Sequence, residues 1–154
     1  MLIMSLLMTD SLGFLISDVS RLLRKRFDER ARLIGVTRQQ WRTLSVLKRH
    51  EGSHQGMLAE LLEVEPITLG RMIDRLEEAG WVERRRDPDD RRMWRIHLTD
   101  AAQPILLQLK AIADAMFLDA AHGIDPDDQA RLQATLERLR ANLSTDSFNE
   151  AANG

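Results

Sequence analysis

The chain has 154 residues, of which 44% are hydrophobic and 30% charged, which fits one ordinary domain or two small lobes. Its 22 basic and 24 acidic residues nearly cancel, so overall charge does not indicate a nucleic-acid partner, and any anion-binding surface must be local. The absence of cysteine excludes disulfide scaffolds, thiolate metal sites and thiol-based redox sensing. This composition is compatible with the reducing cytoplasm, where we expect the protein.

Charge is distributed unevenly along the chain. Residues 1–50 carry 10 basic and 4 acidic side chains, whereas residues 99–154 carry 4 and 9. The opening segment MLIMSLLM is apolar but too short for a membrane span, and it lacks the basic leader and cleavage site of a signal peptide. We expect no membrane partner, and this segment is either a packed arm or an upstream start, since Met4 and Met8 can each initiate translation.

The first predicted element is an amphipathic helix over residues 10–33. Its apolar positions recur at steps of 4, 3 and 4, the spacing of one helix face: Leu12, Ile16, Val19 and Leu23. Gly35 ends this helix, and Thr37 caps a second one that Gly52 ends. The second helix carries Trp41, Leu44 and Leu47 on one face.

Two further amphipathic helices are predicted near the other end of the chain. One carries the stripe Leu106, Leu109, Ile112 and Met116; the other follows Asp125-Pro126 and carries Leu132, Leu136, Leu139 and Leu143. Such stripes are either internal core or a subunit interface. Because helices at both ends of a short chain have few partners within one subunit, we expect a homodimer.

Between residues 53 and 100 the pattern changes to short elements. Ser53 precedes a short helix, and a brief connection leads to Pro66, which opens a helix that runs to Ala79 and is ended by Gly80. Two short helices joined by a tight connection are the helix-turn-helix pattern. Taken alone the pattern is weak, because helical hairpins also occur in proteins that never touch DNA.

A β-hairpin is predicted directly after this pair of helices. Residues 81–86 and 93–98 are rich in β-branched and aromatic side chains, and residues 87–92 between them have the composition of a turn. The hairpin holds six arginines against four acids. Its tip is therefore either a basic projection or a surface on which arginines pair with neighbouring carboxylates for structural reasons.

The order of these elements resembles the multiple-antibiotic-resistance regulator (MarR) family, most closely its SlyA-like branch. The specific motifs are Asp-Arg-Leu-Glu-Glu-Ala-Gly at residues 74–80 and the Asp-x-Arg sequence from Asp90 to Arg92. The resemblance implies a mainly α fold with a small β wing. We therefore expect an N-terminal arm and dimerisation helix in residues 1–36, a winged helix-turn-helix lobe in residues 37–100 and dimerisation helices in residues 101–144. The polar composition of residues 145–154 predicts a disordered tail.

The resemblance also implies a sequence-specific regulator of transcription, a repressor or activator with repression expected, which binds a palindromic operator in double-stranded DNA. We expect Arg71 to bond guanine, Thr68 to meet a thymine methyl group or a phosphate, and Arg75 to contact a base or pair with Glu78. Arg91 and Arg92 suit the minor groove, with Asp90 orienting an arginine. On the helix that Pro66 opens, we expect Thr68, Arg71 or Met72, and Arg75 to share an exposed face. The predicted DNA-binding residues are Ser53, Gln55, Pro66, Thr68, Arg71, Met72, Arg75, Arg91 and Arg92.

One enzyme motif occurs literally. His50-Glu51-Gly52-Ser53-His54 matches the His-Glu-x-x-His pattern of zinc hydrolases, in which both histidines project from one continuous helix. Gly52 predicts a helix end at this point, and Ser53 is expected to cap the helix that follows. We therefore expect no enzyme, no metal and no cofactor. A regulatory metal site that includes His97 or His122 is an alternative without a convincing ligand spacing.

The family precedent is release from DNA by a small aromatic or phenolic effector. We expect the binding site of such a ligand to be lined by Phe14, Trp41, Arg42 and Met116, although a tryptophan in the middle of a helix more often belongs to the core. The alternative function is a helical protein-interaction or scaffold dimer that does not read DNA sequence.

Overall fold

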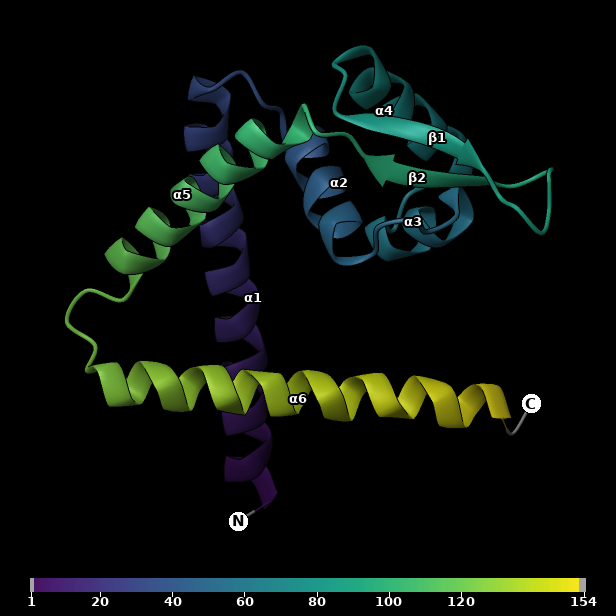
Figure 1. Ribbon diagram of the computed structural model, residues 1–154. Coiled ribbons are helices and arrows are strands. Elements are labelled where there is room, and N and C mark those ends of the chain that lie inside the picture. The colour runs from purple at the N-terminus through teal and green to yellow at the C-terminus, as the bar shows by residue number, and fades with distance from the viewer. Residues whose placement is uncertain (1, 153–154) are drawn as a thin grey trace. The chain divides into compact units, whose positions relative to one another are not determined.

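The computed structural model describes the backbone of residues 2–152 and the side chains of residues 11–144. The chain forms two compact units, residues 1–116 and residues 117–154. Figure 1 shows the elements, whose bounds are α1 (Leu2–Leu33), α2 (Arg38–Arg49), α3 (Gln55–Leu62), α4 (Pro66–Glu78), β1 (Val82–Arg86), β2 (Trp94–Leu98), α5 (Ala102–Ala120) and α6 (Pro126–Ala152). None of the helices within the described residues is long and apolar enough to cross a membrane.

The predicted fold class is confirmed: the chain is mainly helical with one small antiparallel hairpin. In Figure 1, α2, α3, α4 and the hairpin form one lobe, from which the loop between β1 and β2 projects. Val82 lies opposite Leu98 at the base of the hairpin, and Arg86 lies opposite Trp94 near its tip. Helices α3 and α4 with this hairpin form a winged helix-turn-helix.

The predicted helix ends agree closely with the structure where a specific signal marks them. Thr37 and Gln40 form a reciprocal capping box at the start of α2. Gly35 and Gly80 follow α1 and α4 with φ of 77° and 79°, a conformation that glycine adopts without a Cβ clash. The sequence therefore marks these boundaries through local chemistry.

Two predicted boundaries were wrong where that signal is weak. Helix α1 begins at Leu2, eight residues before the predicted start, because the apolar opening segment contains no glycine or proline that would end a helix. Helix α3 has His54 at its N-cap. Ser53, expected there, instead pairs with β2, since its carbonyl oxygen accepts the Ile96 amide at 3.0 Å.

Helix α6 continues to Ala152, past the predicted end of the dimerisation helices at residue 144. The side chains of residues 145–152 lie outside the described part of the chain, as do residues 153 and 154. The predicted disorder of the tail stays a prediction.

The core lies within residues 1–116 and joins every element of the lobe. Helix α4 contributes its inner face, the hairpin contributes Val82 and Ile96, and α5 contributes the stripe that begins at Leu106. For α5 the reading as internal core is therefore correct. The largest fully buried side chains are Leu44, Leu47, Leu58, Leu69, Ile73, Leu76 and Ile96.

The stripes on α1 and α6 differ from the stripe on α5. Leu12, Ile16 and Val19 of α1 are exposed. The four leucines of the α6 stripe are 39–74% exposed. Within residues 11–144, these apolar side chains of α1 and α6 are therefore largely exposed.

A buried carboxylate joins α1 to α2. Asp28 is 6% exposed and accepts a hydrogen bond from Trp41 Nε1 at 2.7 Å, while the Arg38 guanidinium pairs with its second oxygen. The Trp41 ring packs on Phe27 with centroids 4.6 Å apart. Because a buried charge is tolerated only with such partners, Asp28 fixes where α2 begins against α1.

We predict that Asp28→Ala lowers the free energy of unfolding by roughly 1.5–3 kcal/mol, the usual loss for hydrogen bonds to a charged group. Chemical denaturation followed by circular dichroism measures this change. The matched control is Asp18→Ala, which removes an exposed carboxylate of the same helix and should change stability by less than about 0.5 kcal/mol. Equal effects of the two substitutions would contradict the role of Asp28.

Candidate nucleic-acid interface

Helix α4 presents a polar outer face. Thr68, Arg71 and Arg75 are exposed, whereas Leu69 and Ile73 on the opposite side are fully buried. The expected shared face of Thr68, Arg71 and Arg75 therefore agrees with the structure. No ion pair or hydrogen bond engages the Arg71 or Arg75 side chain within residues 11–144, so Glu78 does not hold Arg75.

Met72 corrects the sequence analysis. It was expected on the exposed face as a DNA contact, but it is only 8% exposed and belongs to the core. The reason is helical geometry: Met72 is adjacent to Ile73 and three residues after Leu69, so it lies at the edge of the buried face. Arg71 is thus the residue of this pair that faces outward.

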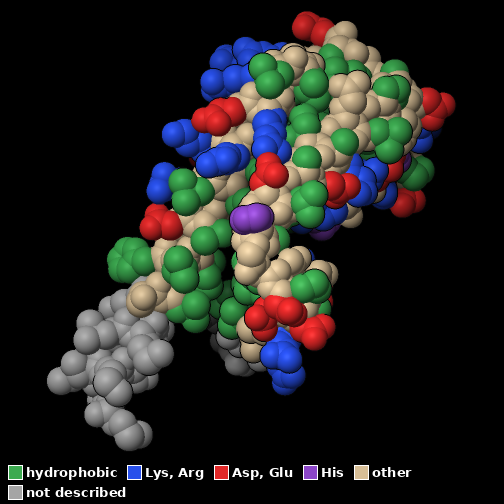
Figure 2. Space-filling model, turned by 90° about the vertical axis from the view of Figure 1, so that its left-hand side faces the viewer, with side chains coloured by type: hydrophobic (Ala, Val, Ile, Leu, Met, Phe, Trp, Pro, Cys, Tyr) green, Lys and Arg blue, Asp and Glu red, His purple; other side chains and the backbone are tan. Residues whose placement is uncertain are grey.

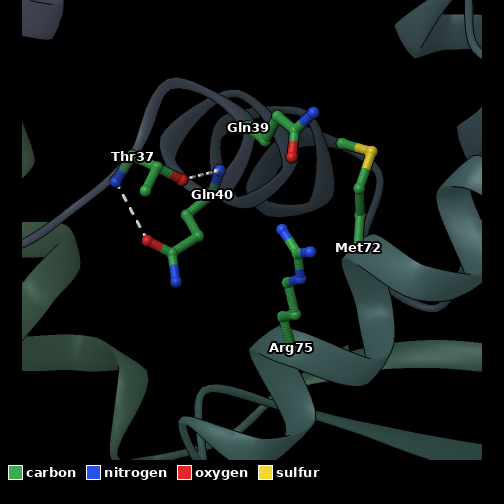
Figure 3. A pocket seen from close by; sticks show the side chains of 5 residues that line it. All are labelled: Thr37, Gln39, Gln40, Met72 and Arg75. Atoms are coloured by element: carbon green, nitrogen blue, oxygen red, sulfur yellow. Dashed lines mark hydrogen bonds between the residues drawn. The ribbon is translucent and has the colours of Figure 1, made fainter.

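A small cavity of about 70 Å³ lies where α4 approaches the start of α2. Figure 3 shows the Met72 and Arg75 side chains extending from α4 toward Gln39, next to the capping box of Thr37 and Gln40. The Arg75 guanidinium lines this cavity near the N-terminus of α2 while remaining exposed. Arg75 is therefore positioned at the edge of the α4 face rather than at its centre.

Ile67 is an exposed residue that the sequence analysis missed. It is 72% exposed in the first turn of α4, one residue before Thr68. A large apolar side chain that remains in solvent at this point can contact the methyl group of thymine. Its exposure was not predictable, because an isoleucine in a short helix is most often counted as core.

Two helix N-termini lie in this lobe without a side-chain cap. Neither His54 of α3 nor Glu65 of α4 makes a capping hydrogen bond among the described residues. The first amides of each helix therefore remain available to an anion. Pro66 is exposed at the start of α4, and Ser53 and Gln55 are half-buried at the start of α3.

Arg84 of β1 fastens the hairpin to α4. This guanidinium is 18% exposed and pairs with Asp74 at 2.7 Å and Glu77 at 2.9 Å, and it donates to the Gly70 carbonyl oxygen at 3.2 Å. Its Nε also donates to Gln55 Oε1 at 3.1 Å, which links α3 to the same group. Arg84 thus neutralises two carboxylates on α4 and fixes the spacing of three elements.

The hairpin arginines divide into two groups. Over residues 81–98, all of which the structure describes, Arg84, Arg85, Arg86 and Arg95 each bind a partner inside the lobe. Arg86, for example, donates to the Arg91 carbonyl oxygen at 2.6 Å and lies over the Trp94 ring. In that same segment the side chains of Arg91 and Arg92 are exposed and bind no partner.

Asp87 organises the wing, and the sequence analysis missed it. It is 4% exposed although it directly follows the exposed last two residues of β1. One carboxylate oxygen, Oδ1, accepts the amides of Asp89 and Asp90 at 2.8 and 3.0 Å. The other, Oδ2, lies 2.6 Å from His54 Nε2 and 2.7 Å from Arg95 Nε.

Asp90 acts on the wing through the backbone. Its Oδ1 accepts the backbone amide of Arg92 at 3.0 Å. This contact is made with an arginine, as predicted, and it engages the amide of Arg92 rather than its guanidinium. Asp90 shapes the turn from which Arg92 projects.

These contacts stabilise the charged form of Asp87. The hydrogen bond from His54 contributes most, followed by that from Arg95 and those from the Asp89 and Asp90 amides, and together they hold the pKa of Asp87 well below its ordinary value of 3.8. A carboxylate whose pKa is lower in the folded than in the unfolded state adds stability above the unfolded pKa. That stability is lost as the pH falls through the range between the two values.

We predict that Asp87→Asn is less stable than the wild type at pH 7, and that the difference persists down to about pH 5 and shrinks below about pH 4. Thermal unfolding across this pH range measures the difference. Asp89→Asn is the matched control, since the Asp89 carboxylate has no partner within residues 11–144. An Asp87→Asn protein as stable as the wild type at pH 7 would contradict the assignment.

The four residues expected to line an effector site lie in different settings. Phe14 is 73% exposed on α1, Met116 is buried in α5, and the Trp41 ring is held by Phe27 and Asp28. Arg42 is half-buried on α2. Neither the cavity at Arg75 nor a second, open depression of about 490 Å³ around His122 is lined by any of the four.

The His-Glu-x-x-His sequence does not form the zinc-hydrolase arrangement. Helix α2 ends at Arg49 with His50 as its C-cap, and Gly52 has a φ of 78°. Glu51 instead accepts the Leu98 amide at 3.2 Å. The two histidines therefore do not lie on one continuous helix.

Comparison with known proteins agrees with this geometry. The MarR family model matches residues 36–93. The transcriptional regulator PA3341 is 36% identical over 87% of this chain and 98% of its own, with a TM-score of 0.73. A MarR transcriptional regulator from Methanosarcina mazei Go1 is 26% identical over 86% and 96% of the two chains, with a TM-score of 0.76.

A mutant MarR from E. coli, solved in complex with operator DNA, is 26% identical and has a TM-score of 0.68 over 84% of this chain and 93% of its own. The winged lobe, the motifs at residues 74–80 and 90–92 and these similarities lead to one conclusion. The chain belongs to the MarR family and has the fold of its transcriptional regulators.

Proposed function

We propose that this protein is a sequence-specific DNA-binding regulator of transcription that acts as a homodimer on a palindromic operator. The observation that carries the proposal is the pairing of charges in the lobe. Four of the hairpin arginines bind partners within the lobe. Arg71, Arg75, Arg91 and Arg92, in contrast, are exposed and have no partner in the described residues. Unpaired guanidinium groups on a helix and an adjacent wing are suited to the negative charge of a duplex.

Helix α4 is proposed to enter the major groove. Arg71, at the centre of its exposed face, suits a bidentate hydrogen bond to guanine, while Thr68 and Ile67 suit thymine methyl groups. Arg75 lies at the edge of the face and suits a phosphate or a flanking base. The free amides at the starts of α3 and α4, with Ser53, Gln55 and Pro66 beside them, would fix the register on the phosphate backbone.

The wing is proposed to reach the adjacent minor groove. Arg91 and Arg92 stand at the tip of the hairpin, beyond the last paired arginine. A narrow minor groove concentrates negative potential and attracts inserted arginines. A protein that spans two grooves in this way excludes others from the same stretch of DNA, which favours repression as the regulatory outcome.

The homodimer would be formed by the apolar faces of α1 and α6. Figure 2 shows hydrophobic side chains gathered at the lower left of the coloured surface, with Lys and Arg side chains above them. The exposed apolar residues of α1 are Leu12, Phe14, Leu15, Ile16, Val19 and Leu22. Apolar surface of this extent on two helices is typical of a subunit interface.

We predict that Leu136→Glu on α6 converts the dimer to a monomer, because it places a charge in the apolar face. Sedimentation velocity over a concentration series measures the change. Asn142→Glu adds the same charge to the same helix outside the leucine stripe and should leave the dimer intact. A wild-type chain that is monomeric at every concentration would contradict the proposal.

The proposed function is tested by selecting duplexes from a random library with the full-length protein and measuring affinity for the selected site by fluorescence anisotropy. We predict that Arg71→Ala costs about 1–3 kcal/mol, concentrated at one base position of each half-site. Arg92→Ala should weaken binding to many sequences more evenly and reduce the salt slope by about 1. A protein that enriches no sequence and shows no salt dependence would instead be the scaffold dimer.

Release by a small aromatic effector stays a prediction, as does membership of the SlyA-like branch. The commitment of the Trp41 ring to Asp28 and Phe27 does not favour a site that includes this residue. A thermal-shift screen of aromatic acids tests for such a ligand, since a ligand that binds the folded state raises the unfolding temperature.

A further inference from the structure

We infer that Asp87 is a positioning residue for DNA binding, whose two carboxylate oxygens set the place of the wing arginines relative to the start of α3. The inference rests on the proposed function and goes beyond it by naming what holds the wing. Asp87 itself is buried and cannot contact DNA. It would act through Arg91 and Arg92.

The two oxygens of Asp87 have separate tasks. Oδ1 accepts the amides of Asp89 and Asp90, which folds the turn that carries the two unpaired arginines. Asp90 then accepts the Arg92 amide and continues the same turn. The conformation of the wing tip thus depends on Oδ1.

The second oxygen joins the wing to a different element. Oδ2 contacts Arg95 across the hairpin and His54 at the N-cap of α3. Because a carboxylate only accepts hydrogen bonds, His54 Nε2 must carry a hydrogen in this contact. Oδ2 therefore ties the wing to the helix whose free amides are proposed to bind phosphate.

The connection between α2 and α3 reinforces this attachment. The Gly52 amide donates to the Ile96 carbonyl oxygen at 2.9 Å, and the Ile96 amide donates to Ser53 at 3.0 Å. The base of β2 is thus held by backbone bonds that a side-chain substitution leaves in place. In the outer half of the hairpin, past Arg95, the side chain that bonds α3 is Asp87. The guanidinium of Arg86 bonds the Arg91 carbonyl oxygen within the wing and does not contribute to this attachment.

Asparagine at position 87 separates a positioning role from a general one. Its amide offers one oxygen, so it cannot accept from both the tip amides and the base residues. Asp89→Asn is the matched control because it removes the same charge two residues away, from a carboxylate that binds nothing within residues 11–144. By charge alone, both substitutions should strengthen DNA binding equally.

The experiment measures the affinity of full-length variants for the selected duplex over a range of salt concentrations. Asp87→Asn is expected to weaken binding about five- to tenfold, the loss of one or two charge-assisted contacts, and to reduce the salt slope. Asp89→Asn is expected to bind as well as the wild type or slightly better. In a background of Arg91→Ala with Arg92→Ala, Asp87→Asn should change affinity less than about twofold, because nothing remains to be positioned.

His54→Ala provides a second variant that leaves the hairpin sequence intact, in case Asp87→Asn folds poorly. Its effect on affinity should likewise disappear in the Arg91→Ala, Arg92→Ala background, whereas a direct phosphate contact by His54 would persist there. The inference is overturned if Asp87→Asn binds like Asp89→Asn, or if its effect survives without the two arginines. A wild-type chain that binds no duplex would overturn the proposed function as well, so the two failures are distinguishable.

Discussion

The attachment of the hairpin to α4 is the constraint on which the rest of the lobe depends. Arg84 bonds two carboxylates and a carbonyl oxygen of α4, and through Gln55 it reaches α3. Arg84 resists displacement because it is itself only 18% exposed, and leaving its acceptors would leave a largely buried guanidinium without partners. Helix α4 and the wing are therefore held at a fixed spacing before any partner binds. For the proposed binding to a duplex, this would reduce the ordering cost.

The same network explains how a chain with a net charge of −2 can present a basic surface. Arg84 forms ion pairs with Asp74 and Glu77 of α4 and so neutralises them. Asp87 accepts hydrogen bonds from His54, Arg95 and backbone amides. These three carboxylates thus serve the structure of the lobe. The arginines without such partners face outward. The sign of the charge on the surface of α4 and the wing therefore depends on the local arrangement of side chains and not on the net charge of the chain.

Features set by local chemistry were predictable from the sequence. The capping box at Thr37, the glycines at 35 and 80 and the turn between the strands each follow from a few neighbouring residues, so the helix-turn-helix and wing were placed nearly correctly. The division of the hairpin arginines was not predictable, since Arg84 depends on acceptors 7 to 29 residues away. The burial of Met72 and the exposure of Ile67 were not predicted for a related reason. The buried and exposed faces of a helix meet along a continuous edge, and packing alone decides on which side of this edge a residue lies.

The most direct test of the account is a dimethyl sulfate footprint of the wild-type protein on its selected duplex, because this reagent methylates guanine N7 in the major groove and adenine N3 in the minor groove. The account predicts protection of guanine N7 in two major grooves about 34 Å apart, as expected for a two-fold symmetric pair of recognition helices. It also predicts protection of adenine N3 in the minor grooves on the outer sides, where the wings would lie. Protection confined to one kind of groove, or an unprotected duplex at saturating protein, would contradict it.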